Sequence, residues 1–148
     1  MNITADFERA LLADIPLTRA MQLSLRDYRD DELVLAAPLA PNVNDKGCAF
    51  GGSLGSLLTL AGWGLIVLHL GERDCDVYVQ DSQMRYLAPV WADFTAHARL
   101  ATDTSWPAFD AALASRGRAR ARVQCRVPLP DGSDACTLEA RFVAIART

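Results

Sequence analysis

Residues that could perform nucleophilic chemistry gather where a long apolar run begins. The five residues Gly51-Gly-Ser-Leu-Gly55 satisfy the pattern G-x-S-x-G, in which Ser53 would be the nucleophile of a serine hydrolase. That pattern needs an apolar strand directly before it, and an aspartate followed by a histidine after it. The preceding Asn-Asp-Lys-Gly segment favours a turn, and the chain is too short for the sheet of that fold. We therefore do not expect a serine nucleophile.

Cys48, just before these glycines, is a second candidate nucleophile. A helix that starts at the glycines would lower the pKa of its thiol. However, no histidine lies near it in the sequence, and buried inert thiols are common. The four cysteines have no metal-like spacing, and only His69 and His97 could join them. We expect reduced thiols, no metal and no cofactor.

Asp45 is the candidate general base. It lies in the loop before the run, where Asn42 and Asn44 could orient a water molecule beside it. A general base must reach the proton that it takes, directly or through one water. The alternative is a turn, because Asn-Asp-Lys-Gly is ordinary turn chemistry.

The run from Cys48 to Leu70 contains no acidic or basic residue apart from His69. A helix that is apolar nearly all round must be buried, by a sheet or by a membrane. The strongly apolar part, residues 57–70, is shorter than a typical membrane span, and the flanking charges are mixed. We expect a core helix over residues 51–70 that ends at Gly71, and no membrane insertion.

Length, composition and charge limit the possible classes of protein. The 148 residues fit one domain, residues 1–148, and 51% of them are hydrophobic. A net charge of −3 gives no general attraction to nucleic acid or to an anionic membrane. Residues 1–15 lack the basic start and apolar core of a signal peptide, so we expect a cytoplasmic protein.

The other elements follow from periodicity. Helical spacing predicts a helix over residues 3–13, and alternation predicts strands at 21–25, 33–37, 77–87, 94–100, 119–127 and 136–146. Residues 106–114 are expected to form a short helix or an ordered loop. The order indicates an α+β protein whose single antiparallel sheet packs one face on the central helix.

This pattern resembles the hot-dog fold, in which a sheet curls around one long helix, over nearly the whole chain. Phe50-Gly-Gly-Ser resembles the His-Gly-Gly motif of hot-dog acyl-CoA thioesterases, and Met84-Arg-Tyr-Leu-Ala-Pro-Val90 resembles their Tyr-Leu-x-Pro strand end. More narrowly, Asn44-Asp-Lys-Gly-Cys-Ala-Phe-Gly-Gly-Ser-Leu54 with Trp63 resembles the small thioesterase-like domain that sometimes follows an acetyltransferase domain.

The resemblance implies hydrolysis of an acyl-CoA or acyl-carrier thioester. The first amides of a helix have no intrahelical acceptor and lie at its positive end, so those of Gly51 and Gly52 would stabilise the oxyanion. The alternative is that these glycines only permit close packing. Many relatives also carry an acidic residue on the helix two turns later. Here Thr59 is the nearest polar residue, and Phe50 replaces the histidine. Ser53 and Thr59 could position water or the thioester oxygen, although such hydroxyls often bond to the preceding turn.

Substrate contacts are expected on both sides of the helix. Residues 77–86 and the apolar helix face would line an acyl tunnel. The expected contacts are Asn42, Phe50, Gln83, Arg85 and Tyr86.

A row of arginines follows the expected 106–114 segment: Arg116, Arg118, Arg120 and Arg122. The last three point to one strand face, and Arg118 and Arg120 would suit phosphates of coenzyme A or of a carrier arm. The alternative is a solvated outer face balanced by acids. The row contains no aromatic residues, so we expect no nucleic-acid binding.

Hot-dog relatives build their sites between protomers, so the resemblance implies a dimer or a tetramer. Two other functions stay open. The missing helix carboxylate favours a non-catalytic acyl-CoA-binding or assembly module. A hot-dog dehydratase or hydratase generally needs a site histidine, and neither His69 nor His97 stands in a fitting context.

Overall fold

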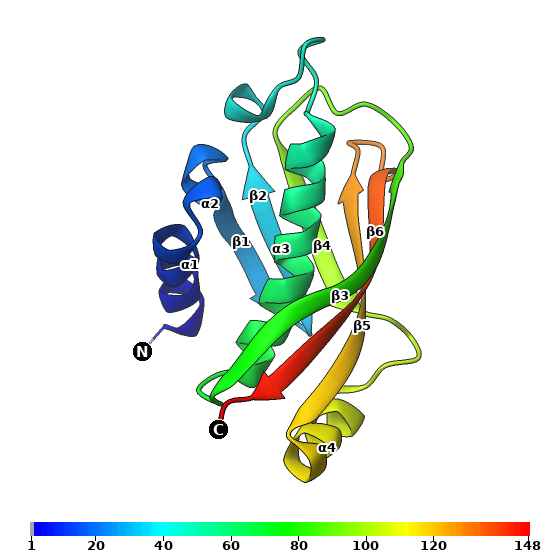
Figure 1. Cartoon of the computed structure of the whole chain (residues 1–148). Coiled ribbons are helices and arrows are strands. Elements are labelled where there is room, and N and C mark those ends of the chain that lie inside the picture. Colours follow the sequence, from blue (N-terminus) through cyan, green and yellow to red (C-terminus); the bar gives the residue numbers. More distant parts are fainter. Residues whose placement is uncertain (1) are drawn as a thin grey trace.

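A curled antiparallel sheet holds the helix α3 against its concave face (Figure 1). The structure is a computed structural model that describes residues 2–148, so Met1 of the expected 1–148 domain lies outside the described residues. The elements in chain order are α1 (Ile3–Asp14), α2 (Pro16–Ala20), β1 (Ser24–Arg29), β2 (Glu32–Ala37), η1 (Ala40–Asn42), α3 (Gly51–Leu70), β3 (Cys75–Tyr86), β4 (Phe94–Leu100), α4 (Trp106–Arg116), β5 (Arg118–Pro128) and β6 (Asp134–Ala146).

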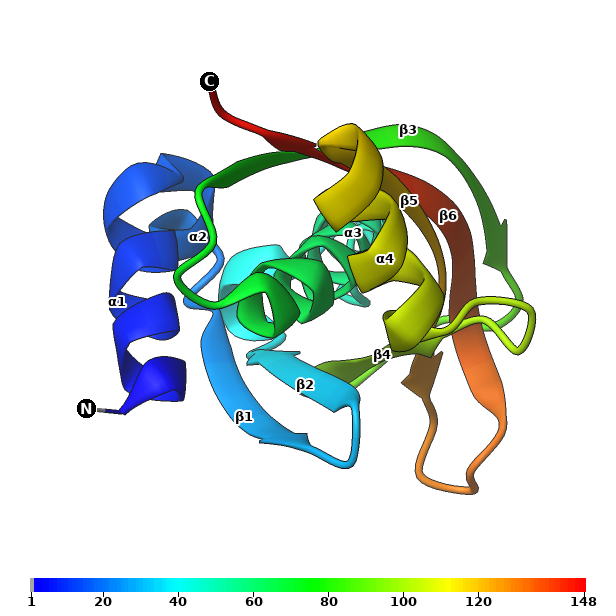
Figure 2. The ribbon, with the colours of Figure 1, turned by 90° about the horizontal axis from the view of Figure 1, so that it is seen from below.

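The six strands have the order β1-β2-β4-β5-β6-β3, and every neighbouring pair is antiparallel. β1 and β3 are the two edge strands. Viewed nearly along α3, the sheet curves around this helix from β1 to β3, while α1 and α2 lie beside β1 (Figure 2). The expected α+β architecture with a long central helix is confirmed.

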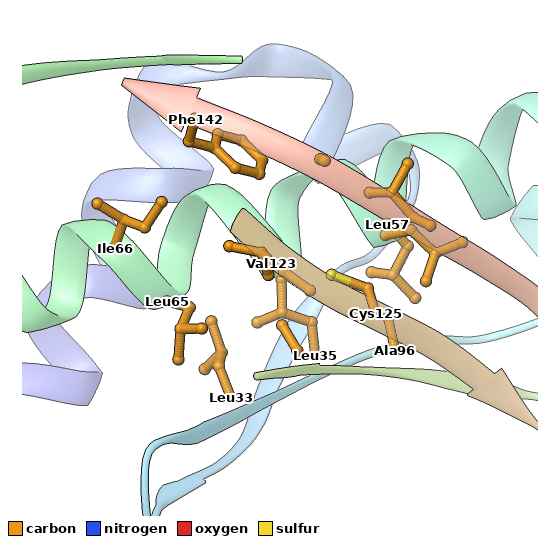
Figure 3. Close-up of a cluster of buried hydrophobic side chains, with 14 of the residues drawn as sticks. Leu33, Leu35, Leu57, Leu65, Ile66, Ala96, Val123, Cys125 and Phe142 are labelled. Carbon is orange, nitrogen blue, oxygen red and sulfur yellow. The ribbon is translucent and has the colours of Figure 1, made fainter. Parts of the chain in front are cut away.

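α3 is the centre of the hydrophobic core. Its residues Leu57, Leu65 and Ile66 are fully buried, and they meet inward side chains of the strands such as Leu35 and Phe142 (Figure 3). The helix packs against β2 to β6. It is long and apolar enough to cross a membrane by length and composition, but 56% of its 18-residue apolar window is buried within the chain.

One side of α3 is only half-buried, contrary to the expectation of burial on nearly all sides. The side chains on this open face are Ser56, Thr59, Leu60, Trp63 and Val67. They recur every three or four residues, so they form one continuous stripe of the helix. The sheet covers the opposite stripe, and no part of residues 2–148 fully covers this one.

Strand alternation sorts the sheet into an apolar inner face and a charged outer face. In β5, Ala119, Ala121 and Val123 are buried, whereas the arginines between them are exposed. Burial also raises the pKa of the Cys125 thiol, and it raises that of Cys136 to about 11. These two inward thiols are therefore un-ionised and unreactive at neutral pH.

The N-terminal third differs from the sequence-based expectation. β1 begins at Ser24 rather than at residue 21, although Met21 and Leu23 are buried. Their alternation therefore indicated burial and not strand pairing. The short helices α2 and η1 were not predicted. In α2, Pro16 occupies the first helical turn, where its fixed φ favours the start of a helix.

We expect Gly62→Ala to destabilise the protein by about 1–2 kcal/mol, a packing cost reduced by the higher helix propensity of alanine. A Cβ at Gly62 would lie 2.9 Å from Cε2 of Phe142, whose ring is fully buried. The matched control is Gly55→Ala, where the nearest atom is Sδ of the flexible Met84, at 3.1 Å. Urea unfolding of both variants measures the difference. Equal stability of the two variants would contradict tight packing of Phe142 on α3.

Candidate active site at the start of the central helix

Asn42 fixes the loop that leads into α3. Its side chain is only 2% exposed, and Nδ2 donates hydrogen bonds to the carbonyl oxygens of Met21 (3.0 Å) and Pro38 (2.8 Å). Its own carbonyl oxygen accepts a hydrogen bond from the Phe50 amide at 2.7 Å, directly before the helix. The amide donors of Asn42 therefore bind the protein backbone, and its expected contact with substrate stays a prediction.

Asn44 closes the turn that carries Asp45. The Oδ1 atom of Asn44 accepts hydrogen bonds from the amides of Lys46 (2.8 Å) and Cys48 (3.3 Å), which is the turn chemistry considered as the alternative. Asp45 stands at the tip, where its carboxylate lies 3.0 Å from the Lys46 ammonium and its side chain is 80% exposed. The carboxylate is therefore open to water, whereas the Asn44 amide oxygen is engaged in the loop.

The first two amides of α3 are unpaired donors. The amides of Ser53 and Leu54 both donate to the Phe50 carbonyl, at 2.9 and 3.0 Å. Within residues 2–148, no acceptor is found for the amides of Gly51 and Gly52. They lie at the positive end of a 20-residue helix that has no side-chain N-cap. An oxygen atom that develops negative charge would be stabilised there.

Two aromatic side chains flank these amides. The Phe50 ring lies over Gly52, where a Cβ would come within 2.4 Å of ring atom Cε2. The Tyr86 hydroxyl donates to the Gly51 carbonyl at 3.1 Å, and its ring would be 3.4 Å from a Cβ at Gly51. Partial burial raises the pKa of Tyr86, with a smaller contribution from Cys136, so the phenol keeps its proton. Glycine at both positions leaves the backbone accessible between the two rings.

Hydroxyl groups follow the glycines along the helix. Ser53 and Thr59 are half-buried, and no hydrogen bond of their hydroxyls to another described residue is found, so they do not bond to the preceding turn. Ser56 on the open face of α3 was missed by the sequence analysis. Its position in the sequence could have identified Ser56 as a candidate, because it lies one turn after Gly52 on a helix with few polar residues.

Side chains take up part of the space expected to form an acyl tunnel. Met84 packs on Gly55, and Nε1 of Trp63 donates to the Val77 carbonyl at 3.1 Å. Surface hollows of about 240–580 Å³ lie elsewhere on the chain, and none of these is lined by a residue of α3. Phe50 and Tyr86 are exposed, so the helix start is an open surface in a single chain.

The structure separates the other expected contacts from this surface. Gln83 and Arg85 alternate with Met84 and Tyr86, so they point to the outer face of the sheet, where they line a hollow of about 450 Å³. Arg118 and Arg120 lie at the end of the sheet where α3 ends (Figure 1). Of the expected residues, Asn42, Phe50, Gly51, Gly52 and Tyr86 come together, and Asp45 lies at the exposed tip of the adjoining turn.

Neither histidine reaches the start of α3. His69 stacks on Trp106 near the end of α3, with a ring-centroid distance of 3.7 Å, and its Nε2 lies 2.9 Å from Asp110. His97 lies on the outer face of the sheet, 3.0 Å from the Thr95 hydroxyl. Cys48 is buried and contacts only the Asn44 amide among the described polar side chains, at 3.2 Å. Within residues 2–148, no group of three or more His, Cys, Asp or Glu side chains could hold a metal ion.

A sheet that curls around one long central helix is the hot-dog fold of the thioesterase superfamily. Residues 4–146 match the family described as "Putative thioesterase (yiiD_Cterm)", and the chain belongs to this family.

Solved structures show the same likeness. A protein of unknown function from Chlorobaculum tepidum TLS is 25% identical, with a TM-score of 0.90 over 98% of this chain and 95% of that one. The putative thioesterase from Shewanella oneidensis is 29% identical, with a TM-score of 0.84 over 97% of each chain. The PaaI protein of E. coli, at 13% identity and a TM-score of 0.72 over 99% and 96%, shares the fold.

Proposed function

We propose that this protein hydrolyses acyl-CoA or acyl-carrier thioesters at the start of α3. The observation that carries the proposal is the pair of unpaired amides at Gly51 and Gly52. When the oxygen of water bonds to the thioester carbon, negative charge moves to the carbonyl oxygen. The two amides would stabilise that charge, and one such donor typically lowers the barrier by about 3 kcal/mol. The carbon–sulfur bond then breaks, and the thiolate takes a proton to leave as the free thiol.

Asp45 is the proposed base for the attacking water. It is the only carboxylate of the loop that leads into α3, and its side chain is open to solvent. Its carboxylate would take one proton from the water as the new carbon–oxygen bond forms. The free hydroxyls of Ser53 and Thr59 would orient the water or the thioester oxygen.

A second copy of the chain is the proposed wall of the site. β3 is an edge strand with exposed Tyr78 and Val79, and the stripe of α3 from Ser56 to Val67 is left half-covered. Exposed strand edges and apolar stripes favour association. We therefore expect a dimer or a tetramer in the cytoplasm, with no nucleic-acid or membrane partner. Size-exclusion chromatography with light scattering measures the mass. A monomer would contradict the proposal that a second copy covers one side of the site.

Release of free thiol from acyl-CoA substrates, from acetyl to palmitoyl, tests the activity. We expect turnover above the spontaneous rate with at least one chain length. Binding of acyl-CoA without turnover would instead support a non-catalytic acyl-binding module, which the lack of a carboxylate on α3 favours.

A further inference from the structure

The groove between α4 and the first residues of β5 forms a second candidate site. It is a hollow of about 580 Å³ whose rim carries Arg116, Arg118 and Arg120. Buried Phe109 and Ala119 form part of its apolar floor. Arg116 ends α4, whereas Arg118 and Arg120 alternate on the outer face of β5, so two elements direct guanidinium groups to one hollow.

The charges of these three arginines are not neutralised within the described chain. No carboxylate of residues 2–148 lies within 4 Å of them, and Arg120 donates only to the amide oxygen of Gln80, at 3.1 Å. Asp103 also lines the groove, but Arg122 binds it at 2.5 Å. A chain of net charge −3 thus concentrates three unmatched positive charges in one place.

Three other outer-face arginines are matched, and the unmatched Arg85 shares its hollow with only two further arginines, the matched Arg99 and Arg126. Arg99 pairs with Glu32 at 3.4 Å, Arg126 pairs with Asp134, and Arg141 lies 3.6 Å from Asp81. In contrast, Arg118 and Arg120 project from one strand face about 7 Å apart, where like charges repel each other. An anion in the groove would remove that repulsion.

We propose that this groove binds a small ligand with two or more linked phosphate groups. Guanidinium forks match phosphate oxygens with paired hydrogen bonds, and linked phosphates can bridge two or three arginines at once. The Ser105 hydroxyl accepts a hydrogen bond from the Ala108 amide at 3.3 Å, so its own proton can be donated to a phosphate oxygen. The apolar floor adds room for the organic part of a nucleotide.

This groove is separate from the proposed active site. α4 lies at the end of α3 and the unpaired amides lie at its start (Figure 1), about 30 Å apart along a 20-residue helix. The proposal therefore does not depend on thioester hydrolysis. As expected from the sequence, Arg118 and Arg120 would bind phosphates. In this proposal Arg116 binds with them, and the three arginines form a site separate from the start of α3.

Isothermal titration of the full chain tests the groove at fixed ionic strength, with inorganic triphosphate, ADP, coenzyme A and citrate as probes. We expect saturable binding of triphosphate at one site per chain, and weaker binding of citrate. The double variant R118Q/R120Q should bind triphosphate at least tenfold more weakly than wild type. The single variant R116Q should also bind more weakly, whereas R99Q should bind as tightly as wild type. If triphosphate binds as tightly as ADP and coenzyme A, the groove recognises the phosphates alone. If the two nucleotides bind more tightly than triphosphate, the apolar floor also contacts their organic part.

The proposal is overturned if none of the phosphate probes binds saturably, if citrate binds as well as triphosphate, or if R99Q weakens binding as much as R118Q/R120Q. Thermal unfolding of each variant shows whether it is folded. R116Q changes a single exposed side chain, so we expect it to fold. If the double variant does not fold, the comparison of R116Q with R99Q still tests the groove.

Discussion

Replacing Gly51 by proline is expected to lower kcat for thioester hydrolysis by about 10²–10³-fold while the fold stays intact. Proline removes the Gly51 N–H, one of the two proposed oxyanion donors. The helix tolerates this change, because proline is favoured at the first helical position. Phe50 already has φ −64° and ψ 133°, the extended conformation that a residue before proline requires. Steady-state kinetics on the best acyl-CoA measures the effect.

Gly51→Ala is the matched control, because it adds a side chain but keeps the N–H. A Cβ at this position would lie 3.4 Å from the Tyr86 ring, which is ordinary contact, so we expect nearly wild-type kcat. Gly51→Pro should also be as stable as wild type, or about 0.4–1 kcal/mol more stable, since proline restricts the unfolded chain. Equal losses in both variants would mean that bulk, and not the amide, matters.

The central helix was predicted to the residue because its signals are local and agree with each other. Residues 51–70 contain no acidic residue, lysine or arginine, and Gly71 with φ 61° ends the helix. β4 was also predicted over its full length, since each inward residue alternates with a polar one. Where burial arose without strand pairing, as at Met21 and Leu23, the same alternation placed a strand start three residues too early.

The candidate site was only partly predictable, because its parts come from segments far apart in the chain. The unpaired amides follow from a helix start with two glycines and no capping side chain. The position of Gln83 and Arg85 depends on which pleat of β3 faces α3, and their alternation with Met84 and Tyr86 is the signal that could have placed them outside.

Tertiary contacts decided the rest of the site. Asn42 binds backbone carbonyls of Met21 and Pro38, and only the folded chain brings Met21 near. The position of Arg118 at the far end of the sheet likewise depends on the strand order, which periodicity alone does not give.

Asp45→Asn is expected to lower kcat/KM by about 10²–10⁴-fold, the usual range for losing a general base. The amide keeps the size of the side chain but cannot take the proton of the attacking water. Steady-state kinetics of both proteins on the best acyl-CoA measures this loss, and thermal unfolding shows whether the variant is folded.

Lys46→Gln separates the base from the ion pair. This variant also breaks the 3.0 Å contact between Lys46 and Asp45, yet it leaves the carboxylate in place. Because an exposed ion pair contributes little to stability, we expect Lys46→Gln to keep its activity. Equal losses in Lys46→Gln and Asp45→Asn would show that the pair shapes the loop. Full activity in Asp45→Asn would move water activation to α3, where Thr59→Val and Ser53→Ala are the next variants, because their hydroxyls have no partner among the described residues.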